Sequence, residues 1–178
     1  MLGQILGLGA AAFMLYFPYY WCKFRNESEA SYGLKWFMTR ESKIYVTIAL
    51  IITLVPLTVI ALHWPVKWGG PLPKRPGLWQ ALDWLGGGVA AAFIEETFYR
   101  GWLQTLLTRR TGAFIAIVIT SLIFALSHLI ALTGWLRVAT FFPGIIMGYL
   151  RFKGGSVMPA IIYHALCNIW AVWWAPVI

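Results

Sequence analysis

Long apolar runs separated by short polar stretches constrain the fold of this chain more than any other feature. Of its 178 residues, 60% are hydrophobic and only 11% are charged, and the mean hydropathy is +0.72. A soluble domain is nearer half apolar and one quarter charged, whereas a membrane-spanning helix needs about 20 mostly apolar residues. Six runs have this character: Leu2–Cys22, Ile44–Leu62, Leu78–Thr108, Ala113–Leu132, Trp135–Leu150 and Val157–Trp174. We therefore expect an all-α, polytopic bundle of about six transmembrane helices in a lipid bilayer.

A stretch rich in proline and glycine, HWPVKWGGPLPKRPG, separates the second run from the third. Such composition is typical of a turn-rich connector. It divides the chain into an amino-terminal pair of spans with the connector, residues 1–77, and a four-helix core, residues 78–178. All the candidate chemistry described below lies in this second part, so we expect it to be the catalytic core.

The net charge of +8 does not indicate nucleic-acid binding, because the basic residues sit in loops between apolar runs rather than along one polar face. The first, third and fifth loops hold nine lysines and arginines, against four in the second and fourth, with Arg100 counted as inside the bundle. Short cytoplasmic loops carry an excess of lysine and arginine. The first, third and fifth loops are therefore expected in the cytoplasm and both termini outside.

Two adjacent glutamates, Glu95 and Glu96, lie inside the third apolar run. Ionisable groups within membrane helices are costly and mark function by default. Glu96 and Arg100 are four residues apart and can pair along one helix face. Glu95 points about 100° away, on the face of Tyr99, with no local cation. We therefore assign Glu95 to chemistry as a general base and treat Glu96 and Arg100 as its support.

Two histidines lie within later apolar runs. His128 ends the segment FALSH, four residues after Phe124, and His164 begins HALCN, four residues before Asn168. A single buried histidine is more often a packing residue than a catalyst. Two buried histidines together with an intramembrane carboxylate make a catalytic role more favoured than packing alone, because polar groups in lipid need partners. We expect Glu95, His128, His164 and Asn168 to converge in one cavity.

Three short motifs carry a resemblance to a known family. EETFYR fits EExxxR, FALSH fits FxxxH and HALCN fits HxxxN, in that order and on successive predicted helices. Together they resemble the CPBP family of glutamic-type intramembrane endopeptidases, also called the CAAX protease or Abi family. The resemblance covers roughly Leu78 to Trp174.

The resemblance implies a role for each motif. Glu95 with His128 would activate a water molecule, and His164 with Asn168 would form an oxyanion hole. The supporting residues would be Glu96, Arg100, Tyr99 and Phe124. The implied activity is hydrolysis of a peptide bond in a membrane-anchored protein or peptide, without a metal or other cofactor and without nucleic acid. The implied location is the inner or cell membrane of a prokaryote, as a multi-pass protein.

Other functions fit some of the same residues. His128, His164 and Glu95 could form a two-histidine, one-carboxylate zinc site, although the HExxH spacing of zinc proteases is absent. Intramembrane glutamates and histidines also serve as proton relays in transporters and channels. A third alternative is a non-catalytic membrane scaffold. Cys167, three residues after His164, is disfavoured as a nucleophile because an apolar buried thiol is normally inert.

Overall fold

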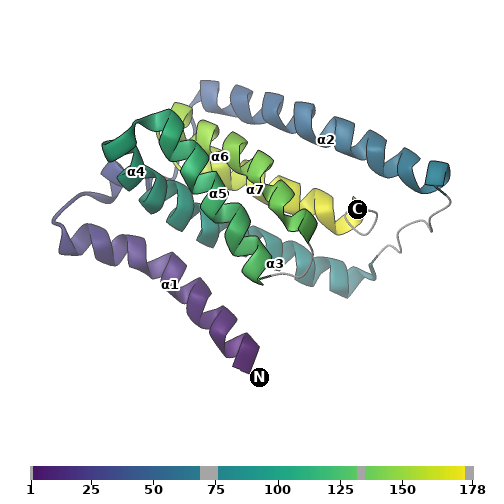
Figure 1. The fold of residues 1–178 in the computed structure, drawn as a ribbon, viewed down its shortest axis with the longest axis horizontal. Coiled ribbons are helices and arrows are strands. Elements are labelled where there is room, and N and C mark those ends of the chain that lie inside the picture. Colours follow the sequence, from purple (N-terminus) through teal and green to yellow (C-terminus); the bar gives the residue numbers. More distant parts are fainter. Residues whose placement is uncertain (1, 69–75, 132–134, 175–178) are drawn as a thin grey trace.

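The computed structural model describes residues 2–68, 76–131 and 135–174, and these residues form helices joined by short loops, without a strand (Figure 1). The all-α prediction is thereby confirmed. The elements are α1 (Leu2–Phe24), the 3₁₀ helix η1 (Glu29–Tyr32), α2 (Arg40–Trp68), α3 (Leu78–Glu96), the π-helix η2 (Thr97–Leu103), α4 (Gln104–Thr111), α5 (Ala113–Ala131), the 3₁₀ helix η3 (Trp135–Thr140), α6 (Phe141–Gly154) and α7 (Met158–Trp174).

Two helical segments within the described residues are long and apolar enough to cross a membrane, Ile5–Phe24 and Arg40–His63. Ala113–Leu129 is apolar but shorter. The number of six spans, the side on which each loop lies and the division at residue 77 stay predictions.

The third predicted segment is one uninterrupted helical run that changes type twice. It begins as α3, widens into the π-helix η2 directly after Glu96, and ends as α4. Gly112, with a φ of 80°, then turns the chain into α5. Glu95 precedes this turn by almost the same number of residues as His128 follows it. The helical hairpin therefore brings Glu95 and His128 to the same height.

The fifth predicted segment begins later than the hydrophobicity suggests. Residues 135–140 form the 3₁₀ helix η3, and the α-helix starts only at Phe141. Pro143 fits this start, because proline lacks a backbone N–H and would break the hydrogen-bond ladder of a helix that began further upstream. Proline is tolerated in the first turn of a helix, which is where α6 places it.

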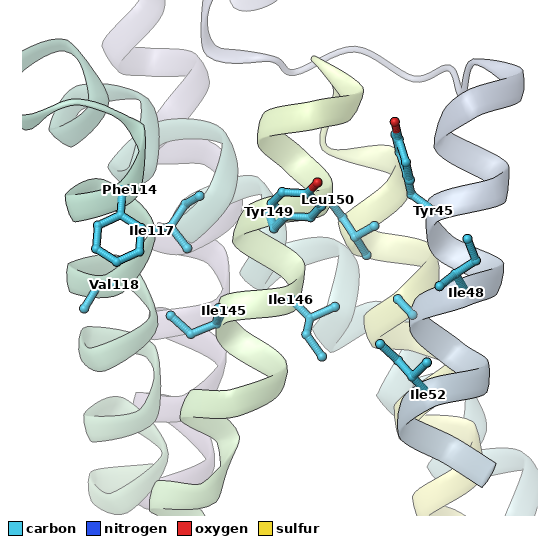
Figure 2. A pocket seen from close by; sticks show the side chains of 11 residues that line it. Tyr45, Ile48, Ile52, Phe114, Ile117, Val118, Ile145, Ile146, Tyr149 and Leu150 are labelled. Atoms are coloured by element: carbon cyan, nitrogen blue, oxygen red, sulfur yellow. The ribbon is translucent and has the colours of Figure 1, made fainter. Parts of the chain in front are cut away.

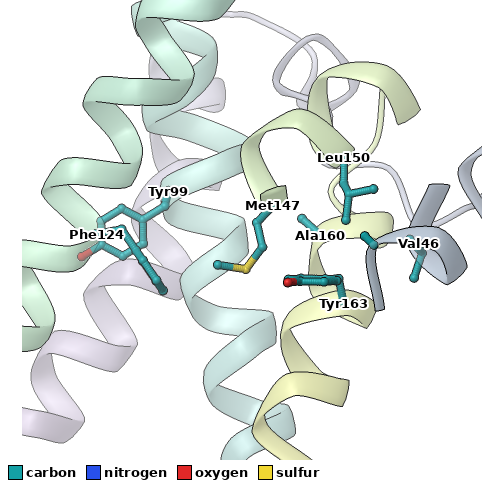
Figure 3. Close-up of a cluster of buried hydrophobic side chains, with 8 residues drawn as sticks. Val46, Tyr99, Phe124, Met147, Leu150, Ala160 and Tyr163 are labelled. Carbon is teal, nitrogen blue, oxygen red and sulfur yellow. The ribbon is translucent and has the colours of Figure 1, made fainter. Parts of the chain in front are cut away.

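Helix α7 lies at the centre of the core and packs against α3, α6 and α2. Helices α2 and α1 lie on opposite sides of the core helices (Figure 1). The largest buried apolar cluster joins α2, η2, α5, α6 and α7 (Figure 3). Its members are Val46, Ala49, Tyr99, Phe124, Met147, Leu150, Ala160 and Tyr163. Two predicted supporting residues, Tyr99 and Phe124, thus belong to the core itself.

The first loop is bound tightly to the core. The Gly33 carbonyl accepts a hydrogen bond from the Val157 backbone N–H at 2.9 Å. Arg109 donates to the Glu27 carboxylate and, at 3.2 Å, to the Tyr32 hydroxyl. The hydrogen bond from Arg109 lowers the pKa of the Glu27 carboxyl. These contacts join the amino-terminal part of the chain to α4 and α7.

Gly33 and Gly155 offer a matched test of this loop. Both adopt a left-handed backbone, with φ of 66° and 63°, which costs about 1–2 kcal/mol for a residue with a Cβ. A Cβ on Gly33 would also collide with the Arg151 guanidinium, whereas one on Gly155 would meet nothing within 4 Å. We expect Gly33→Ala to be the more destabilising by roughly 1–3 kcal/mol. Thermal unfolding in lipid nanodiscs measures the difference, and equal losses would contradict the predicted collision.

Candidate active site

The Glu96 carboxylate is the most heavily bonded group of the site. Its Oε1 accepts hydrogen bonds from Arg100 Nη1 at 3.2 Å and from His164 Nδ1 at 2.9 Å. The side chains of Glu96 and Arg100 are both 0% exposed. The pairing of Glu96 with Arg100 that their spacing predicts is present. The sequence predicted that His164 would lie near Glu95, but it did not predict the bond from His164 to Glu96.

Arg100 extends the contact to two further helices. Its Nη2 donates to the Gly144 carbonyl of α6 at 3.1 Å, and its guanidinium carbon lies 4.4 Å from the centre of the Phe124 ring of α5. A Cβ on Gly144 would lie only 3.1 Å from the Cβ of Ser121. The missing side chain at Gly144 therefore lets α6 come close enough to α5 to accept the bond from Arg100.

Glu95 lies where both histidines converge. Its Oε2 is 4.0 Å from His128 Nε2 and 3.9 Å from His164 Nε2. Both distances exceed hydrogen-bonding range, and within the described residues Oε2 is buried without a hydrogen-bond partner. The three side chains are partly accessible, at 24% for Glu95, 18% for His128 and 9% for His164. Oε2 and the two Nε2 atoms are thus close neighbours that do not bond directly to one another.

The partners of the two histidines fix which ring nitrogen faces Glu95. His128 Nδ1 lies 2.9 Å from the Phe124 carbonyl, which can only accept a hydrogen bond, so Nδ1 carries the proton. His164 Nδ1 donates in the same way to the Glu96 carboxylate. In both rings Nε2 is left facing Glu95. A neutral imidazole protonated at Nδ1 offers an unprotonated Nε2, which can accept a proton.

Asn168 lies one helical turn beyond His164 and bonds to α3. Its amide Nδ2 donates to the Gly88 carbonyl at 2.9 Å. A Cβ on Gly88 would be 3.0 Å from the Cβ of Asn168, so this contact depends on glycine. One N–H of the Asn168 amide donates to Gly88, and the second N–H can donate to another acceptor. The structure brings Glu95, His128 and His164 together, whereas Asn168 contacts the same helix about two turns before Glu95.

The last supporting residue, Tyr99, bonds across to α5. Its hydroxyl donates to Ser127 Oγ at 2.8 Å, and the Ser127 hydroxyl donates to the Phe124 carbonyl at 2.7 Å. Phe124 also packs its ring against His128, with ring centres 4.4 Å apart. Ser127 was not singled out from the sequence, because a serine inside an apolar helix gives no distinctive signal.

Two apolar grooves open on the surface away from these residues. One, of about 670 Å³, lies along α6 between α2 and α5 (Figure 2), and the other, of about 730 Å³, lies between α1 and α3. Neither is lined by Glu95, His128, His164 or Asn168. Within the described ranges, no three His, Cys, Asp or Glu side chains are arranged to hold a metal ion.

Comparison with known proteins gives one family. A family model described as Rce1-like, type II CAAX prenyl endopeptidase, matches residues 77–170, more than half of the chain. No curated protein and no solved structure matches the chain. The matched range includes every candidate site residue from Glu95 to Asn168 and excludes α1 and α2.

Glu96→Gln tests whether the buried carboxylate organises the site. The substitution leaves Arg100 as a buried cation without its counter-charge, and breaking a buried pair in this way costs about 3–5 kcal/mol. Glu27→Gln is the matched control, since it removes a carboxylate from an exposed arginine pair that water screens. We expect the Glu96 variant to be far less stable than the Glu27 variant in denaturant unfolding. Similar midpoints would show that the buried pair does not organise the fold.

Proposed function

The chain belongs to the Rce1-like family of type II CAAX prenyl endopeptidases, and from this premise we propose that Glu95 and His128 activate the water that it uses for hydrolysis. The family makes the protein a membrane-embedded peptide hydrolase. The substrate that we propose is the carboxy-terminal tail of a prenylated, membrane-anchored protein or peptide. The observation that carries the mechanism is the convergence of two Nε2 atoms on Glu95 Oε2.

The first step is proton transfer from water. A water held between Glu95 Oε2 and His128 Nε2 can donate one proton to either acceptor while its oxygen attacks the scissile carbonyl. General-base catalysis of this kind contributes about 10²–10⁴ in rate. The same proton can then pass to the nitrogen of the leaving peptide, so that water and one peptide bond become a carboxyl group and an amine.

The second step needs donors for the developing oxyanion. His164 donates Nδ1–H to Glu96, so it can serve as an oxyanion donor only if Nε2 carries a second proton. Asn168 has one N–H beyond the one bonded to Gly88. Preorganised donors of this type cost no rearrangement when charge develops in the transition state.

A zinc-dependent reaction is the alternative within the same fold. The contacts that orient His164 and His128, a carboxylate and a backbone carbonyl, are also the kind that orient zinc-binding histidines. The side chains are nevertheless not arranged as a metal site in the described residues. We propose that the reaction needs no metal, because Glu95 and His128 can take the proton from water without a Lewis acid.

Glu95→Gln is expected to reduce cleavage of a farnesylated CAAX peptide in lipid vesicles by about 10²–10⁴-fold. Glutamine preserves the packing but cannot take a proton from water. Asp83→Asn is the matched control, because it changes an exposed acid to an amide on the same helix and should leave the rate unchanged. Asn168→Ala should lose about 10²–10³-fold, as for one oxyanion donor.

The pattern of these variants distinguishes the alternatives. A proton relay or a non-catalytic scaffold would give no cleavage in any variant, including the unaltered protein. Full cleavage by Glu95→Gln at normal protein level would refute the assignment of the base.

Metal dependence is tested by chelation. We expect cleavage of the same peptide to persist after dialysis against a strong chelator, because proton transfer to Glu95 and His128 needs no Lewis acid. Loss of activity that returns on adding Zn²⁺, together with zinc in the purified protein by mass spectrometry, would favour the zinc mechanism instead.

A further inference from the structure

The distance between Glu95 and His128 depends on the contacts between the helical run 78–111 and α5. The two residues stand on different helices: α3, which carries Glu95, packs mainly against α7 and α1, and the run 78–111 contacts α5 mostly through α4 and η2. Their reactive atoms, Oε2 and Nε2, are 4.0 Å apart without a direct hydrogen bond. A site that holds a water between two groups works only if their separation is kept within a fraction of an ångström.

One hydrogen bond joins the two helices at this height. Tyr99 OH donates to Ser127 Oγ at 2.8 Å. In the part of the chain that the structure describes, no other side-chain hydrogen bond links the run 78–111 to α5. Tyr99 is four residues after Glu95, and Ser127 directly precedes His128. The bond therefore ties together the two turns that carry the reactive groups.

Ser127, which accepts this bond, also contacts the Phe124 carbonyl, the group that orients the His128 ring. The Ser127 hydroxyl donates to the Phe124 carbonyl at 2.7 Å, and His128 Nδ1 donates to that carbonyl at 2.9 Å. The Tyr99 ring also packs edge-on against the Phe124 ring, with centres 5.2 Å apart (Figure 3). Tyr99, Ser127 and the Phe124 carbonyl thus form a continuous chain of contacts from the Glu95 helix to the His128 ring.

We propose that Tyr99 and Ser127 are positioning residues, whose hydroxyl–hydroxyl bond keeps His128 Nε2 close to Glu95 Oε2, at 4.0 Å in this structure. The inference rests on the proposed function, because it concerns the same water. Neither residue touches the substrate in this account. Tyr99 is buried in the core cluster, and it acts through the spacing of α3 and α5.

Tyr99→Phe removes one oxygen atom and keeps the packing of the ring. We expect kcat for the farnesylated peptide to fall by on the order of tenfold to a hundredfold, since small misplacements of reacting groups have effects of this size. KM should change little, because the substrate-binding surface is untouched. A purely structural role would instead lower the amount of folded protein and leave the kcat of the folded fraction unchanged.

Tyr163→Phe is the matched control. Tyr163 is also a buried tyrosine of the core cluster, and its hydroxyl donates to a hydroxyl on another helix, Thr53 Oγ1 of α2, at 3.2 Å. Tyr163→Phe removes a phenolic oxygen from the same buried cluster as Tyr99→Phe does, but the hydrogen bond that it breaks joins α7 to α2. We expect a comparable loss of thermal stability in both variants and an unchanged kcat only in Tyr163→Phe.

A double-mutant cycle isolates the bond itself. Ser127→Ala should lower kcat as Tyr99→Phe does, and the double variant should be no slower than the slower single variant, because both remove one interaction. Ser127→Thr keeps the hydroxyl and should restore most of the activity lost in Ser127→Ala. If the fold losses in kcat of the two single variants multiply in the double variant, the proposal is overturned.

The outcomes separate this inference from the proposed function. If the unaltered protein does not cleave the peptide, the proposed function fails and this inference fails with it. If it cleaves, but Tyr99→Phe retains the kcat of Tyr163→Phe, only the positioning role is wrong. If both tyrosine variants lose kcat equally, the loss follows from general loosening of the core, and the positioning role is again wrong.

Discussion

The arrangement of this site depends on the burial of one carboxylate. Glu96 is fully enclosed, and a charge in such a place is tolerated only when it is paired and hydrogen-bonded. Arg100 supplies the charge from the next turn of the same helical run, and His164 supplies a second donor from α7. Because Arg100 also donates to α6, the contacts of Glu96 and Arg100 bring α3, α6 and α7 together at one point.

The two adjacent glutamates differ through their partners. Glu96 has two strong donors, whereas Glu95 has only the distant Nε2 atoms of His128 and His164. In the described residues each carboxylate has one buried oxygen, Oε2, without a hydrogen-bond partner, but Glu96 is held by two bonds at its other oxygen and Glu95 is not. Exceptions to the rule that buried polar atoms are hydrogen-bonded are expected at functional sites. Neighbouring residues of a helix point about 100° apart, so Glu95 and Glu96 can face different partners although they are adjacent in sequence.

The sequence predicted the parts that local spacing controls. The pairing of Glu96 with Arg100 followed from their four-residue separation, and most helices begin and end near the ends of the apolar runs. Contacts between helices far apart in sequence left no local pattern, so the bonds from His164 to Glu96 and from Tyr99 to Ser127 were not foreseen. The π-helix after Glu96 was missed as well, because its residues are as apolar as those of an ordinary helix.

Contacts between polar side chains and glycine carbonyls explain how these helices pack without a hydrophobic driving force. Inside a membrane, lipid tails are as apolar as leucine, so helices associate through close packing and hydrogen bonds. Three times, a side chain on one helix donates to the backbone carbonyl of a glycine on its neighbour, where the missing Cβ permits close approach. The pairs are Arg100 with Gly144, Gln104 with Gly148, and Asn168 with Gly88. Along the helical run, Gly88 precedes Glu95 while Arg100 and Gln104 follow it, so these contacts tie the run to α6 and α7 on both sides of Glu95.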